Sequence, residues 1–142
     1  MNGISFKVMG APVPKGRPRF RAVGKFVQTY TPKKTLDAEK EIRKAFEEQN
    51  PTFRVPLNGP ISLSIRFLMP IPTSISKKQK EALKLKPHLK KPDTDNLVKT
   101  VCDALNGYVW NDDSQICCIH AEKYYQLEVP CTIVIIEQLG EE

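Results

Sequence analysis

The fold of this chain is decided by one stretch, Asp93-Thr94-Asp95-Asn96-Leu97-Val98-Lys99-Thr100-Val101-Cys102-Asp103-Ala104-Leu105-Asn106-Gly107. Its apolar residues recur at helical spacing, which predicts an amphipathic helix. The side expected to be buried consists of Leu97, Val98, Val101, Cys102 and Leu105, and the opposite side of Asn96, Lys99, Thr100 and Asp103. Asp95 is a suitable N-cap and Gly107 a suitable stop, so the helix should end just before that glycine.

Carboxylates gather around the start of this predicted helix. Lys99 lies four residues after Asp95, one turn along the same side, and Asp93 precedes it in chain that should be extended. Carboxylates that converge repel one another unless a cation lies between them, and oxygen ligands that leave room for water suit Mg²⁺ or Mn²⁺. A second acidic pair, Asp112 and Asp113, could return to the helix N-terminus if the next strand pairs beside it.

Each of these residues also has a purely structural interpretation. The first two aspartates could only cap the helix, and Lys99 could only form an ion pair one turn away. Asp112 and Asp113 could simply begin a turn before a strand. Taken together, three carboxylates and a lysine around one helix, next to a long basic run, favour a functional site.

Two basic segments suggest a polyanionic partner. Every charged side chain from residue 7 to residue 25 is basic, and three prolines and a glycine keep residues 12–20 out of regular structure. A stiff backbone loses less entropy when its arginines are ordered on phosphate. The connector 76–91 holds seven lysines and one glutamate. The residues that we expect to contact phosphate are Lys15, Arg17, Arg19, Arg21, Lys77, Lys78, Lys90 and Lys91.

The rest of the chain predicts strands and one further long helix. Thr31 as N-cap and Pro32 at the first helical position begin this helix, which should run to about Gln49. The clearest half-buried strand alternates from Ile61 to Phe67. The other expected elements are strands at 4–9, 115–125 and 131–137, a hairpin at 20–23 and 26–30, and a short helix at 76–85 capped by Ser76.

These elements predict a single domain over residues 1–142. The fold class is α/β in a loose sense, equally well labelled α+β, with a mixed sheet of about five strands and two main helices. The net charge of +6 favours an anionic partner, either nucleic acid or a membrane surface. No apolar run approaches the ~20 residues of a membrane span, and residues 1–8 lack the apolar core of a signal peptide. We therefore expect a cytoplasmic protein without a membrane partner.

Three blocks of this sequence resemble the signature of one known family. They are Lys91-Pro92-Asp93-Thr94-Asp95-Asn96-Leu97-Val98-Lys99, Asp103-Ala104-Leu105-Asn106-Gly107 and Trp110-Asn111-Asp112-Asp113-Ser114-Gln115-Ile116. In this order and at these gaps they resemble the RusA-type Holliday junction resolvases, also called crossover junction endodeoxyribonucleases. The resemblance covers roughly the C-terminal half of the central region. The N-terminal half matches only loosely, in its Pro-Lys-Gly-Arg-Pro-Arg loop.

The resemblance implies a RusA-like fold and a homodimeric endonuclease that cuts four-way junction DNA. It implies Mg²⁺ or Mn²⁺ as cofactor and no small-molecule cofactor. Carried over residue by residue, the three catalytic and metal-binding aspartates are Asp93, Asp95 and Asp113, and the essential lysine is Lys99. The W-x-D-D-x-Q block makes Asp113 a better match than Asp112. Asn96 and Asp112 are expected to contact the metal-binding aspartates without binding the metal themselves.

The resulting hypothesis is metal-assisted hydrolysis of phosphodiester bonds, with Lys99 placing positive charge on the phosphate. Two alternatives stay open. One is a Mg²⁺-dependent nuclease for other branched or flap DNA, and the other is a non-catalytic basic nucleic-acid-binding protein. The sequence is compatible with a role in host DNA repair and with one on a prophage.

Overall fold

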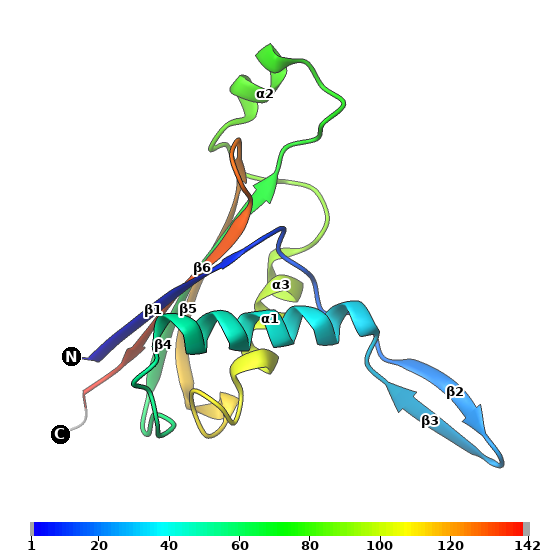
Figure 1. The fold of residues 1–142 in the computed structure, drawn as a ribbon, viewed down its shortest axis with the longest axis vertical. Coiled ribbons are helices and arrows are strands. Elements are labelled where there is room, and N and C mark those ends of the chain that lie inside the picture. Colours follow the sequence, from blue (N-terminus) through cyan, green and yellow to red (C-terminus); the bar gives the residue numbers. More distant parts are fainter. Residues whose placement is uncertain (1, 141–142) are drawn as a thin grey trace.

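The structure, a computed structural model, describes residues 2–140. Its centre is a four-stranded mixed sheet (Figure 1). In their order across the sheet the strands are β1 (Asn2–Met9), β6 (Cys131–Gln138), β4 (Ile61–Pro70) and β5 (Ile116–Gln126). β6 pairs antiparallel with both of its neighbours, whereas β5 lies parallel to β4 at the edge. A parallel pair requires a long crossover, and residues 71–115 provide it.

The alternation in β4 places every second residue in the core. Ile61, Leu63 and Ile65 are buried, and Leu63 lies beside Ile136 of β6 and Ile119 of β5. β-branched and other apolar side chains that project from one face of a pleated sheet need a covering layer. That layer consists of two helices.

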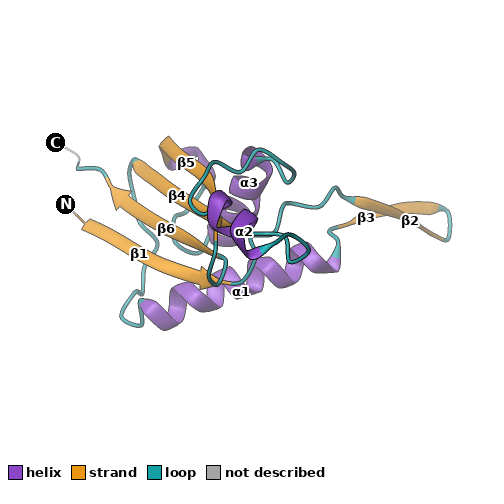
Figure 2. Ribbon diagram, turned by 90° about the horizontal axis from the view of Figure 1, so that it is seen from above, coloured by secondary structure: helices purple, strands orange, loops and turns teal. Residues whose placement is uncertain are grey.

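α1 (Lys33–Gln49) and α3 (Thr94–Leu105) pack against the same face of the sheet (Figure 2). α1 contributes Ile42 and Phe46 to the core, and α3 contributes Leu97, Val101 and Leu105. Each such side chain stabilises the fold by about 1.5–3 kcal/mol when it is removed from water. The apolar stripe predicted for the 94–105 helix is therefore what holds α3 to the sheet.

The remaining strands, β2 (Arg19–Val23) and β3 (Phe26–Tyr30), form a two-stranded sheet of their own. The hairpin leaves the body beyond the start of α1 and projects away from it (Figure 1). Gly24 adopts a φ of 62° in the turn, a conformation that glycine adopts without strain. The hairpin prediction is confirmed, but the expected sheet of about five strands is a sheet of four plus this separate pair.

α2 (Lys77–Leu83) lies at the far end of the crossover, beyond the end of β4. Its N-cap Ser76 forms a capping box with Gln79, as the predicted short helix requires. After α2 the chain returns along β5: the backbone N–H of Leu85 donates to Tyr125, and that of His88 to Lys123. The crossover is therefore fastened to the sheet shortly before it enters α3.

The boundaries of the two long helices differ slightly from prediction. α1 begins at Lys33 with Pro32 as its N-cap, one residue later than expected, and it ends at Gln49 as predicted. The N-cap of α3 is Asp93, so Asp95 lies inside the first turn and the prediction of Asp95 as N-cap is wrong. Gly107, with a φ of 76°, follows the end of α3 as expected. Among the described residues no helix is long and apolar enough to cross a membrane.

Candidate active site

The exposed side of α3 carries charged residues at intervals of one turn. Asp95, Lys99 and Asp103 follow one another at four-residue spacing, so they line one side of the helix. Asp93 stands at the N-cap, just before this stripe. The opposite side packs into the core, which leaves Asp95 and Lys99 exposed to solvent.

Two of the structural interpretations fail at the N-terminus of α3. The Asp93 side chain makes no capping hydrogen bond. Its partner is Lys91, at 3.2 Å, in a pair whose side chains are 86% and 59% exposed and which therefore contributes little to stability. Within residues 2–140, Asp95 and Lys99 have neither a side-chain hydrogen bond nor an ion pair, so the expected i,i+4 pair is absent. Within the described residues, Asp95 and Lys99 thus carry unpaired charges, and Asp93 has only its exposed pair with Lys91.

A buried core residue fixes the orientation of the Asp113 side chain. The indole Nε1–H of the fully buried Trp110 donates to Asp113 Oδ1 at 2.7 Å. Asp112 instead caps the short 3₁₀ helix η1 (Asp113–Gln115), accepting from the backbone N–H of Ser114 at 3.0 Å while its own N–H donates to the Gln115 side chain. Asp112 thus has a structural role, and Asp113 is held through one of its two carboxylate oxygens by the indole of Trp110.

Asp113 interacts electrostatically with residues of α3. Desolvation raises the pKa of Asp113, the Trp110 hydrogen bond opposes this, and the negative charges of Asp103 and Asp112 raise it further. Burial, followed by the charges of Asp113 and Asp103, raises the pKa of Cys102 to about 12. The charge of Asp103 thus acts on Asp113, and the expected return of the acidic pair to the helix N-terminus stays a prediction.

The carboxylates do not close into a complete metal cage. Among residues 2–140 no group of three or more His, Cys, Asp or Glu side chains is arranged to hold an ion. Asp93 and Asp95 lie at the start of α3, Lys99 lies one turn further on, and Asp113 lies in η1. The candidate carboxylates therefore come from two elements, the start of α3 and η1.

Lys15 is largely buried, whereas the basic residues near it in the sequence are exposed. Its ammonium contacts Glu39 of α1 and Asp103 of α3, both at 2.9 Å, and only 18% of the side chain is exposed. Desolvation lowers the pKa of Lys15, but the hydrogen bonds and charges of the two carboxylates outweigh it and the pKa is raised. Lys15 ties α1 to α3 and neutralises Asp103 in this structure, and its predicted contact with phosphate stays a prediction.

The loop that carries Lys15 is held against α3 by Asn96. The Asn96 side-chain amide donates to the Lys15 carbonyl at 3.1 Å, and the Lys15 backbone N–H donates to the Asn96 carbonyl at 3.2 Å. At Gly16 the loop passes so close to α1 that an added Cβ would lie 2.8 Å from the buried Thr35 hydroxyl. Asn96, predicted to support the ligands, thus anchors a loop beside them.

A residue that the sequence did not single out fastens the other side of the site. Lys123 of β5 donates through its ammonium to the carbonyls of Lys90 and Pro92, both at 2.6 Å. Burial lowers the pKa of the neighbouring His88, and the positive charge of Lys123 lowers it further. Lys123 is one lysine among many in a basic chain, and only its place on β5 beside the crossover distinguishes it. It fixes the segment that ends at Asp93.

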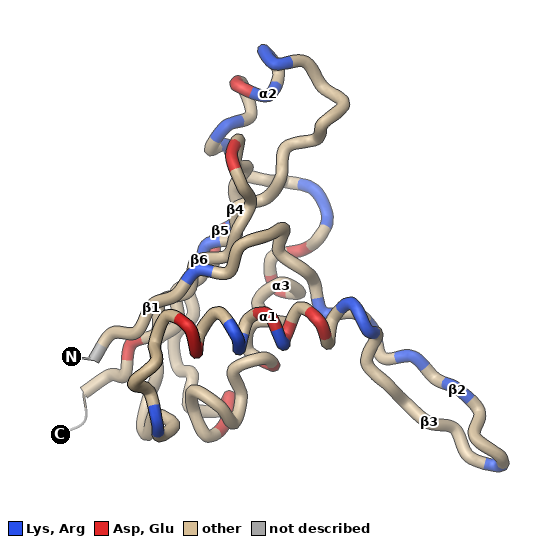
Figure 3. The backbone as a smooth tube through the Cα atoms, viewed as in Figure 1, with Lys and Arg blue, Asp and Glu red and all other residues tan. Residues whose placement is uncertain are grey.

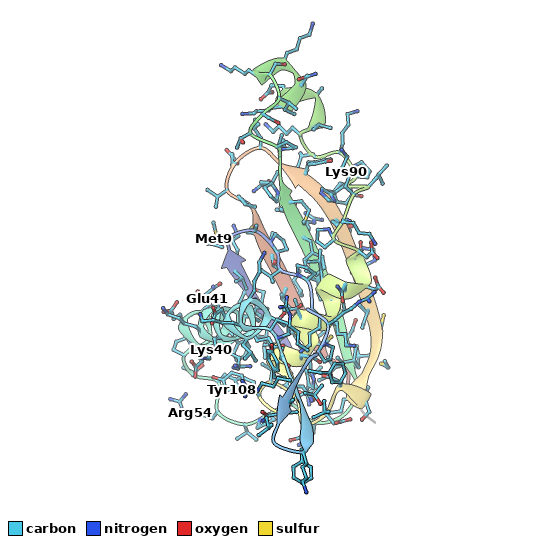
Figure 4. The ribbon with its side chains drawn as sticks, turned by 90° about the vertical axis from the view of Figure 1, so that its right-hand side faces the viewer. Met9, Lys40, Glu41, Arg54, Lys90 and Tyr108 are labelled. Carbon is cyan, nitrogen blue, oxygen red and sulfur yellow. The ribbon has the colours of Figure 1, made fainter. Side chains whose placement is uncertain are left out.

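The other basic residues predicted to contact phosphate are exposed. Lys90 projects from the crossover above α3 (Figure 4), and the basic crossover leads directly into the acidic start of that helix (Figure 3). The exposed members of the set are Arg17, Arg19, Arg21, Lys77, Lys78, Lys90 and Lys91. They lie in two regions, the hairpin and its approach on one side and the crossover on the other.

Comparison with known proteins agrees with this geometry. An uncharacterised protein of Bacillus subtilis (strain 168), YqaN, is 33% identical over 141 residues, which cover 96% of this chain and 98% of that protein. Residues 9–137, nearly the whole chain, match the family "Endodeoxyribonuclease RusA". This match includes the hairpin, α3 and the anchored aspartate after it. The chain therefore belongs to the RusA endodeoxyribonuclease family.

Proposed function

We propose that this protein is a Mg²⁺- or Mn²⁺-dependent endodeoxyribonuclease that resolves four-way (Holliday) junctions by hydrolysing phosphodiester bonds in symmetry-related strands. Family membership supports endonuclease activity on junction DNA. The observation that carries the assignment of the site is the set of charged groups at the start of α3. Asp95 and Lys99 have no ion pair among residues 2–140, and Asp93 has only its exposed pair with Lys91. Functional carboxylates are commonly left without stabilising partners because their ligand supplies the compensating charge.

The donor chemistry fits a hard divalent cation. Mg²⁺ retains several waters and is usually held by one or two protein carboxylates together with substrate phosphates, so it needs no complete protein cage. We propose Asp93, Asp95 and Asp113 as its ligands. The negative charges of Asp103 and Asp112 already oppose ionisation of Asp113, and a cation would relieve this repulsion. When bound, the metal supplies an activated water and neutralises charge on the scissile phosphate.

Lys99 lies on α3, one turn from Asp95 and one turn from Asp103. Its ammonium would meet the non-bridging oxygens of the phosphate, where negative charge grows in the transition state. Trp110 would hold Asp113 by the bond that it donates, and Asp112 would hold η1 in place. These contacts leave the reacting groups few alternative orientations.

The exposed lysines and arginines on both sides of the site would bind the DNA backbone. Each phosphate contact releases counterions, so binding should weaken steeply as salt concentration rises. A junction has two symmetry-related strands to cut, and a two-fold homodimer would carry one site for each. We therefore propose that the active protein is a homodimer.

The deciding experiment compares cleavage of a four-way junction, a flap and a linear duplex of matched sequence, with Mg²⁺ and with EDTA. We expect symmetric nicks in the junction with Mg²⁺ only. Asp95→Asn should abolish cleavage and retain junction binding, because removing a negative charge does not weaken attraction to phosphate. Asp37→Asn is the matched control, since Asp37 is an exposed helical aspartate on α1 paired only with Lys33.

Each other outcome identifies an alternative. Preferred cleavage of the flap would indicate a nuclease for another branched DNA. Binding without any cleavage would indicate a non-catalytic nucleic-acid-binding protein. Cleavage by Asp95→Asn in Mg²⁺ would falsify the assignment of the site.

A further inference from the structure

The β2–β3 hairpin makes no use of its apolar side chains inside this chain. All ten strand residues are exposed, including Phe20 at 70%, Phe26 at 78% and Val27 at 70%. The hairpin reaches away from the sheet and both long helices (Figures 1 and 2). A two-stranded ribbon of this kind is marginally stable in water on its own, so exposed phenylalanines here point to contact with a partner.

The register gives the ribbon two different faces. Residues paired across the strands project to the same side, and one side carries Arg19, Arg21, Gln28 and Tyr30. On this side Arg21 donates to the Gln28 side chain at 2.9 Å and its guanidinium lies 5.2 Å from the centre of the Tyr30 ring. The other side carries Phe20 and Val27, whereas Phe26 shares the arginine side at the tip of the ribbon. Each face therefore has one phenylalanine.

The charge of the hairpin favours an anionic partner. Arg19, Arg21 and Lys25 lie on it, and no aspartate or glutamate occurs before Asp37. Two copies of this arm would repel one another, whereas a polyanion would be attracted to it. An anionic partner that also accepts exposed aromatic rings is nucleic acid with accessible base faces.

We infer that the β2–β3 hairpin is a DNA-binding arm that stacks Phe20 and Phe26 on unpaired bases at the branch point, while Arg19, Arg21 and Lys25 contact the flanking phosphates. In a regular duplex the base faces are covered by neighbouring pairs, so both rings would stay in water. At a branch point bases unstack at lower cost, and aromatic side chains stack on them or enter between base steps. The arm would thus contribute selectivity for branched DNA, away from the carboxylates that cut. This inference rests on the proposed function, since it takes junction DNA as the substrate.

The test measures binding in EDTA, so that cleavage does not enter the result. A junction carries 2-aminopurine either at the branch point or in the middle of one arm, and affinity is measured for this junction and for a linear duplex. The variant Phe20→Ala/Phe26→Ala is compared with Phe20→Leu/Phe26→Leu, which retains apolar volume without a ring. Val55→Ala/Val129→Ala is the matched control, because it truncates two exposed apolar residues outside the hairpin, at 70% and 56% exposure.

We expect the fluorescence of the branch-point probe, and not of the arm probe, to change when the wild-type protein binds. Both phenylalanine variants should lose this change and at least about tenfold of junction affinity, since stacking on one base is worth about 1–3 kcal/mol and two rings are removed. Duplex affinity and the control variant should change less than about twofold on the same scale. If the alanine variant has a lowered Tm, the binding result of the leucine variant is used instead, because leucine keeps the apolar volume and removes only the ring.

Three results would overturn the inference. Equal losses of affinity for the junction and for the duplex would indicate that the hairpin binds a groove of regular DNA. A change in sedimentation without a change in branch selectivity would make it a contact between copies of the chain. Unchanged binding would leave the rings without a role in DNA recognition. The proposed function fails separately, when the wild-type protein shows no preference for the junction or no metal-dependent cleavage.

Discussion

The ammonium of Lys123 on β5 donates a hydrogen bond to the backbone carbonyl of Pro92, at 2.6 Å, immediately before the N-cap of α3. The same ammonium also bonds the Lys90 carbonyl. The edge strand therefore determines where the chain enters α3. Since Asp93 follows directly, the position of its carboxylate depends on a side chain that takes no part in the proposed chemistry.

We expect Lys123→Met to lower the cleavage rate about tenfold to a hundredfold, because misplacement by about 1 Å has effects of this size. The concentration of Mg²⁺ needed for half-maximal cleavage should rise, while junction binding in EDTA changes little. Lys123→Arg, which keeps the charge and the donors, should recover part of the activity. Lys86→Met on the same crossover is the control, and an equal loss there would mean that only general positive charge matters.

Asp113→Asn should raise the stability of the metal-free protein at neutral pH. The substitution removes a carboxylate that is repelled by Asp103 and Asp112, and an asparagine oxygen can still accept from Trp110. A rise in Tm of about 2–4 °C in EDTA is expected for a gain of the order of 1 kcal/mol. Added Mg²⁺ should stabilise the wild type more than the variant. A lowered Tm in EDTA would show that this carboxylate supports the fold.

The pH dependence of stability should include a contribution from Glu122. Hydrogen bonds from His120 and then from Arg66 lower the pKa of Glu122 below its ordinary value of 4.5. A carboxyl whose folded pKa is depressed adds stability above its unfolded pKa and loses it as the pH falls through the folded pKa. Urea unfolding from pH 6 to pH 3 should therefore show a smaller acid loss for Glu122→Gln than for the wild type. Glu128→Gln, in the exposed β5–β6 turn, should follow the wild type.

Much of the local structure could be predicted because its causes are local. The apolar spacing from Leu97 to Leu105 gives α3, Gly24 gives the hairpin turn, and Ser76 caps α2. The site residues Asp93, Asp95 and Lys99 could be named for the same reason, since they lie within two turns of one helix. Periodicity and capping act over a few residues, and the sequence displays them directly.

What could not be predicted depends on contacts between distant segments. The position of Asp113 depends on how β5 pairs with β4 and on the buried Trp110 whose indole donates to it. The task of Lys123 arises only because the crossover returns along β5. The sequence does not show whether a given lysine is exposed or bonded to another segment. Counting charges therefore could not distinguish Lys15, which binds two carboxylates, from its exposed neighbours.

The contrast between Lys15 and Arg17 gives a final prediction. Lys15 neutralises Glu39 and Asp103, whereas Arg17 is exposed two residues further on. Lys15→Met should lower the free energy of unfolding by about 1–3 kcal/mol, because it leaves two partly buried carboxylates beside each other. Arg17→Gln should leave stability within about 0.5 kcal/mol and reduce the salt dependence of junction binding by about one phosphate contact.

Urea unfolding and salt titrations of junction binding measure both effects. Because the lost cation of Lys15 lies 2.9 Å from each carboxylate, its removal should also loosen the contact between α1 and α3, and hydrogen exchange in α3 should accelerate. If Lys15→Met instead kept full stability and lost salt dependence, this ammonium would be a phosphate contact after all, and its carboxylate partners would be exchanged for DNA on binding.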